Sequence, residues 1–154
     1  MTDRELLWCA CRHHIGERIL VHSWDSLKIE ASRSPEISLF KRFKENFDML
    51  TYTNVNTRDL SIPETLPQWE SKRQAIVDFC NLSLGEGFAR GDYAELAKLT
   101  LIYLNASKEQ NVTIYRPGAS HKARFMSKLI YSLKIVLMSN QISNHPAGTI
   151  LAAG

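Results

Sequence analysis

No part of this sequence holds the roughly 18 consecutive apolar residues that a membrane-spanning helix needs, so we expect no membrane span. The first residues include Asp3 and Glu5 and then further charges, which is unlike a secretory signal peptide. Cysteine is also scarce, and three cysteines in 154 residues fit reduced thiols better than a disulfide framework. Together these absences predict an intracellular protein.

Acidic residues are missing from the last part of the chain, residues 111–154. That segment holds five basic residues: Arg116, Lys122, Arg124, Lys128 and Lys134. The preceding 110 residues hold the other 14 basic and all 16 acidic residues, a net charge of −2 within a chain whose formal charge is +3. A basic end on a near-neutral body suggests contact with a polyanion, while a merely solvated helix face is an equally weighted alternative.

Apolar residues make up 44% of the chain, enough for a core, and their spacing is helical. Five helices are predicted, over residues 3–26, 34–50, 67–84, 92–106 and 119–139. The loop TYTNVN and the connector VTIY are expected to form at most brief extended pieces. The sequence therefore predicts an all-α bundle of about five helices in one domain, residues 1–140, with no substantial sheet and a frayed tail over 141–154.

Each predicted helix has a side that should face the core. A serine and a proline, Ser34 and Pro35, should start the second helix. The residues expected along one face of that helix are Ile37, Phe40, Phe43 or Lys44, and Phe47. The expected inward residues of the third helix are Trp69, Ile76, Phe79 or Cys80, and Leu84. Those of the last helix, which Ser120 should cap, are Met126, Leu129, Ile130, Leu133 and Leu137.

The stretch WCACRHHIG crowds two cysteines and two histidines into the first helix. Cys11 and His14 are three residues apart, so they should share one helical face. A structural zinc site needs four converging ligands, commonly from two separate segments, and the second pair is missing here. We therefore predict no metal and no cofactor, with Cys11 as a small buried group, and keep a zinc site on this pair as a minor alternative.

The segment RPGASHKARFMSKLIYSLKI carries cations at helical spacing, which suits contact with a nucleic-acid backbone. The candidate contact residues are Arg116, His121, Lys122, Arg124 and Lys128. In an equally weighted alternative, Arg124 or Lys128 pairs with carboxylates of a neighbouring helix. Asp92 and Glu95 are suitable carboxylates.

Three segments together resemble a family of transposon-derived invertebrate proteins similar to hAT-like transposases. They are LLWCACRHHIGERIL, SPEISLFKRFKENF and RPGASHKARFMSKLIYSLKIVL, and the resemblance covers most of residues 4–138. It implies an RNase H-like core with an acidic metal-binding triad, a Cys-x-x-His pair matched here by Cys11 and His14, and a helical insertion that would begin after about Ser34.

The chain departs from this family pattern at the catalytic residues. The upstream Ser/Thr/Asn-rich stretch and the final strand with its glutamate have no counterpart, and no acidic residue matches the triad. Two-metal phosphoryl transfer requires such carboxylates, so we expect no enzyme activity. The expected product is a non-catalytic, transposase-like fragment that binds nucleic acid weakly, with a nuclear location implied by the resemblance alone.

The main alternative function is a helical interaction or oligomerisation module. In the resembled family the first helix would lie on the core that is missing here, so its apolar side would be uncovered. Such a surface favours self-association or a partner protein.

The nucleic-acid hypothesis makes a prediction about salt. Affinity for duplex DNA, measured by fluorescence anisotropy, should fall steeply between about 50 and 200 mM salt, because phosphate contacts release counterions. Replacing Arg124 and Lys128 by glutamine should lower the salt dependence by about one counterion for each charge removed. Absence of binding even at low salt would contradict the hypothesis.

Overall fold

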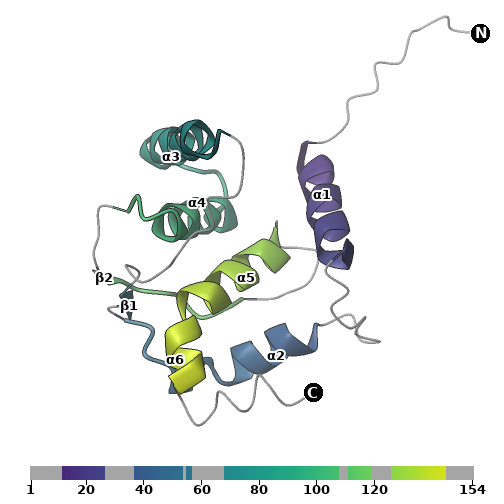
Figure 1. The fold of residues 1–154 in the computed structure, drawn as a ribbon, viewed down its shortest axis with the longest axis vertical. Coiled ribbons are helices and arrows are strands. Elements are labelled where there is room, and N and C mark those ends of the chain that lie inside the picture. Colours follow the sequence, from purple (N-terminus) through teal and green to yellow (C-terminus); the bar gives the residue numbers. More distant parts are fainter. Residues whose placement is uncertain are drawn as a thin grey trace, which may run out of the picture. The chain divides into compact units, whose positions relative to one another are not determined.

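The computed structural model describes residues 12–26, 37–53, 55–56, 68–107, 111–118 and 126–144. These residues form, in chain order, α1 (Arg12–Ser26), α2 (Ser38–Glu45), the 3₁₀ helix η1 (Phe47–Met49), β1 (Val55–Asn56), α3 (Trp69–Glu86), α4 (Gly91–Tyr103), β2 (Asn111–Val112), α5 (Ser127–Leu137) and α6 (Ser139–Asn144) (Figure 1). The predicted all-α class is confirmed. The chain divides into two units, Met1–Ala31, which contains α1, and Ser32–Gly154, which contains the other elements.

The third and fourth helices begin and end within about three residues of their predicted bounds, whereas two other helices begin later than predicted. Helix α2 starts at Ser38, because Ile37 before it is extended (φ −68°, ψ 123°), so the start predicted at Ser34 is wrong. Helix α5 starts at Ser127 and not at the predicted cap Ser120, because Met126 is left-handed with φ 51°. Residues 3–11, 34–36, 119–125 and 145–154 lie outside the described residues.

Part of the predicted frayed tail is helical. Helix α5 ends at Leu137 with Met138 as its C-cap, and α6 follows at once and extends to Asn144. No helix among the described residues is both long and apolar enough to cross a membrane.

One part of the core of the second unit is aromatic. Phe40 and Phe43 on α2 and Phe47 on η1 are each about 1% exposed, which confirms the predicted stripe. The ring of Tyr131 on α5 lies 4.8 Å from that of Phe40, centroid to centroid, and its hydroxyl donates to the carbonyl of Gly118. Burying these rings ties the short α2 to α5, because each removes a large apolar area from water.

The other part of the core lies between α3 and α4. Val77 and Cys80 on α3 pack with Ala97, Leu101 and Leu104. Helix α4 also packs on α5, so α4 lies between α3 and α5 (Figure 1). This order places α3 at one side of the three-helix stack.

Two loops pair through short extended segments, as the sequence allowed. Val55 of β1 pairs with Val112 of β2 in an antiparallel register, and both side chains are buried. The backbone N–H of Ile114 continues the contact by donating to the carbonyl of Tyr52 at 2.8 Å. The pairing holds the segment after β2 against the helices, where it forms part of the cleft described below.

The aromatic core predicts the cost of truncating one ring. Phe43→Ala should lower the free energy of unfolding by about 3–5 kcal/mol, because it removes a buried ring and leaves a cavity. The matched control is Met49→Ala, since Met49 lies two residues after Phe47 and is 60% exposed. Urea unfolding should place the control within about 0.5 kcal/mol of the wild type. Equal effects of the two substitutions would contradict this packing.

Candidate functional site

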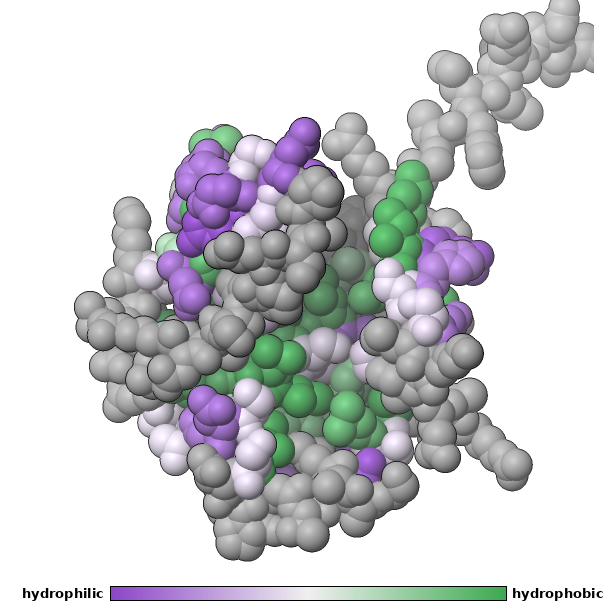
Figure 2. Space-filling view, viewed as in Figure 1, coloured by the Kyte–Doolittle hydropathy of each residue, from purple (hydrophilic) through white to green (hydrophobic). Residues whose placement is uncertain are grey.

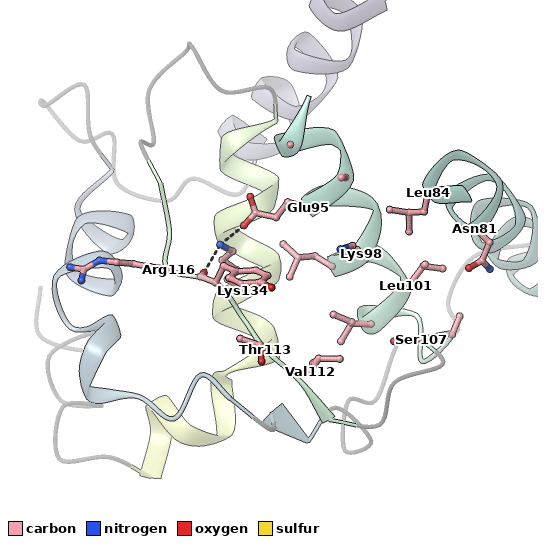
Figure 3. Close-up of a pocket in the computed structure, with 16 residues that line it drawn as sticks. Asn81, Leu84, Glu95, Lys98, Leu101, Ser107, Val112, Thr113, Arg116 and Lys134 are labelled. Carbon is pink, nitrogen blue, oxygen red and sulfur yellow. Dashed lines mark hydrogen bonds and ion pairs between the residues drawn. The ribbon is translucent and has the colours of Figure 1, made fainter. Parts of the chain in front are cut away.

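A cleft of about 660 Å³ opens where α4, α5 and the segment after β2 meet (Figure 3). Its apolar lining includes Leu84 from α3, Leu101 from α4 and Val112 from β2. Charged side chains of Glu95, Lys98, Arg116 and Lys134 also line it. The cleft is therefore a mixed surface in which paired charges sit beside hydrocarbon.

Lys134 is the most deeply placed of these charges, and its side chain is completely buried. Its ammonium Nζ lies 2.5 Å from Oε1 of Glu95 on α4 and donates to the carbonyl of Tyr115 at 2.7 Å (Figure 3). A buried ammonium without such partners would cost several kcal/mol in lost hydration. The pair thus fixes how α5 sits on α4 and on the segment after β2.

Arg116 is also paired, but at the surface. Its guanidinium lies 2.5 Å from the carboxylate of Asp48 on η1, and both side chains are more than half exposed. Figure 3 shows Arg116 extending away from the other labelled residues. An exposed pair of this kind contributes about 1 kcal/mol or less.

The five predicted nucleic-acid contacts are only partly described. Arg116 pairs with Asp48, and Lys128 lies half-buried on α5. His121, Lys122 and Arg124 lie outside the described residues. The sequence suggested Glu95 as a partner of Arg124 or Lys128. In the structure the carboxylate of Glu95 pairs with Lys134, which was not among the predicted partners. Nucleic-acid binding therefore stays a prediction.

The cysteine and histidine predictions fall at the edge of the described chain. His14 lies within α1, although its side chain is not described, and Cys11 lies outside the described residues. Over the part of the chain that the structure describes, no three His, Cys, Asp or Glu side chains gather in a way that could hold a metal ion. Burial raises the pKa of the Cys80 thiol, which disfavours the nucleophilic thiolate form.

A second surface lies on the outer side of α3. Phe79 is 65% exposed, Leu82 63% and Ile76 40%, and their spacing places them on one side of the helix. The sequence predicted that Ile76 would face the core and left Phe79 and Cys80 as alternatives. Cys80 and Val77 are buried, so the assignment of Ile76 is wrong and that of Cys80 is right. We call Ile76, Phe79 and Leu82 the α3 outer stripe.

The opposite, inner side of α3 is held against the end of α4 by hydrogen bonds. Arg73 on α3 donates from its Nη2 to the carbonyl of Leu104, at the end of α4, at 2.8 Å, and from its Nε to the same oxygen at 3.2 Å. A cation at a helix C-terminus also meets the negative end of the helix dipole. This clamp holds the rotation of α3 about its axis and so determines which side chains stay outside. Figure 2 is drawn from the same viewpoint as Figure 1. Polar side chains predominate on the part of α3 that is visible there.

The first unit has exposed apolar residues of its own. Ile15 and Ile19 of α1 are 47% and 63% exposed and lie four residues apart, on one face of the helix. The sequence predicted that the first helix would have an uncovered apolar side and would bind a partner or a second copy through it. Binding through it stays a prediction.

Comparisons with protein-family models, with curated proteins and with solved structures found no match to this chain. The transposase resemblance therefore has no support beyond the quoted segments and stays a prediction.

Sequence reasoning missed both Lys134 and the α3 outer stripe, although each leaves a signal. Lys134 interrupts the apolar run LIYSLKIVLM, where a lysine needs a buried partner. Helix α3 has apolar residues at 76 and 79 and again at 77 and 80, a wider apolar band than one packed face requires. That excess width indicates a second contact surface.

The buried pair predicts a non-additive mutational cycle. Glu95→Gln should cost about 3–5 kcal/mol of unfolding free energy, because it leaves the Lys134 ammonium buried without its counter-charge. Lys134→Met in the same chain should recover much of that loss, since the double variant buries no charge. Arg116→Gln, which breaks the exposed pair, should cost about 1 kcal/mol or less in the same urea titration. Simple additivity of Glu95→Gln and Lys134→Met would argue against the pair.

Proposed function

We propose that this chain is a helical protein-interaction module whose docking surface is the α3 outer stripe. The exposure of Phe79 and Leu82 carries the proposal, since each large apolar side chain is more than 60% accessible to water. Exposed apolar residues scattered singly are ordinary, but contiguous ones on a rigid element mark contact sites. Aromatic residues, phenylalanine among them, are also enriched at protein interfaces relative to the rest of the surface.

The surroundings of the stripe support helix-to-helix docking. The stripe runs along a helix of 18 residues, about 27 Å long. Its flanks are polar: Gln74 and Asp78 hydrogen-bond each other at 2.7 Å, and Asn81 is exposed. A hydrophobic stripe with a polar rim resembles the anatomy of protein interfaces. Because Arg73 clamps α3 onto α4, little ordering cost accompanies binding.

The docking surface that we propose lies on α3, whereas the sequence alone pointed to the first helix as the interaction surface. The transposase-like origin and the nucleic-acid affinity stay separate predictions, and the salt titration tests the second of them. A zinc site on Cys11 and His14 stays a minor one.

A photo-cross-linker at position 79 tests the proposal. Phe79→p-benzoylphenylalanine should yield covalent adducts to protein after irradiation of the source cells, because the ring would lie inside the interface. The matched control is Tyr115→p-benzoylphenylalanine, since Tyr115 is an equally exposed aromatic residue, at 69%, on another surface. Adducts should be at least several-fold more abundant from position 79. Equal yields from the two positions, or none from position 79, would refute the docking surface.

A further inference from the structure

We infer that the partner of the α3 outer stripe is a second copy of this chain, paired helix to helix and antiparallel about Phe79. This inference rests on the proposed interaction function and specifies its partner. Three features of α3 carry it: the spacing of the stripe, the charges at its two ends, and the sizes of the residues that would face each other.

The spacing is that of a helix that pairs with another helix. The residues at 72, 75, 79, 82 and 86 alternate steps of three and four, the a/d pattern of a two-helix seam. Lys72, Ala75, Phe79, Leu82 and Glu86 occupy these positions. All five are exposed. Such a seam packs at a shallow crossing angle, which lets two helices stay in contact over several turns.

The charges at the ends of the seam are opposite and equally distant from its centre. Lys72 lies seven residues before Phe79, and Glu86 lies seven residues after it. Within the described part of the chain, neither side chain forms an ion pair of its own. An antiparallel pair centred on Phe79 therefore places Lys72 of each copy opposite Glu86 of the other. A parallel pair would place lysine against lysine and glutamate against glutamate, which is unfavourable.

The residues between the ends also complement each other in size under the same twofold symmetry. Small Ala75 would lie against large Leu82 of the second copy, and large Ile76 would lie against small Ser83. Phe79 would face itself on the axis, where two rings can pack offset or edge to face. A surface that complements its own copy in this way is what an isologous dimer requires.

The contact is confined to one helix from each copy, so the dimer is weak. It falls below the roughly 800 Å² per partner of a standard interface, and we expect a dissociation constant of about 10–100 μM. Sedimentation equilibrium of the full chain from about 5 μM to 1 mM should therefore show a reversible monomer–dimer equilibrium. Phe79→Ser should weaken it at least about 30-fold, because both copies lose the central ring.

The charge arrangement provides the decisive test. Lys72→Glu alone and Glu86→Lys alone should each weaken dimerisation about tenfold, since each puts two like-charged contacts into the dimer. An equimolar mixture of these two variants should associate as the wild type does, because every contact in the mixed pair is again between opposite charges. The double variant Lys72→Glu/Glu86→Lys should also recover self-association. Lys98→Glu, the same charge change on α4, should leave the dimer unchanged.

A strict monomer at 1 mM would overturn the inference, as would a dimer insensitive to Phe79→Ser. Failure of the two single variants to associate with each other would exclude the antiparallel arrangement. The cross-linking yield at position 79 separates this inference from the proposed function. Adducts only to other polypeptides would leave the docking surface intact and exclude the second copy, whereas absence of any adduct would remove both.

Discussion

Helix α3 has two adjacent apolar sides, and a neighbouring helix can cover only one of them. The inner side, with Val77 and Cys80, packs on α4, and both of these side chains are buried there. The outer side keeps Phe79 and Leu82 in contact with water, at a cost proportional to their exposed apolar area. This unequal covering underlies the assignment of α3 as a docking surface, because a partner would remove that cost.

Two polar contacts determine which side is covered. Arg73 reaches the carbonyl of Leu104 at the end of α4 and so fixes the rotation of α3. Lys134 and Glu95 do the same for α5 on the other side of α4. Hydrophobic packing has little directional preference, whereas buried hydrogen bonds and ion pairs lose several kcal/mol when misaligned. In this chain they set the order of the three helices, and the exposed position of the α3 outer stripe follows from that order.

The sequence predicted the helical class and the aromatic face of α2, because local spacing carries both. Phe40, Phe43 and Phe47 recur at helical spacing, and only the choice between Phe43 and Lys44 was left open. On α3 both apolar sides have the spacing of a helix face, so spacing alone does not tell which side is buried. That depends on the hydrogen bond from Arg73 to Leu104, a residue 31 positions away in the sequence. The partners of Lys134 could not be predicted from the sequence either, because Glu95 on α4 and the carbonyl of Tyr115 come close to it only in the folded chain. The late start of α5 also went unpredicted, because the left-handed Met126 has no local sequence signal.

The central claim is that the Phe79 ring lies in water in the monomer while the rings of α2 and η1 do not. Solvent accessibility of individual phenylalanine rings measures this directly, through fluorine NMR of chain labelled with fluorophenylalanine in the presence of a soluble paramagnetic agent. In dilute solution the Phe79 resonance, assigned with Phe79→Leu, should relax strongly, and those of Phe40, Phe43 and Phe47 should be protected. A Phe79 resonance as protected as that of Phe43 in the dilute monomer would contradict the account.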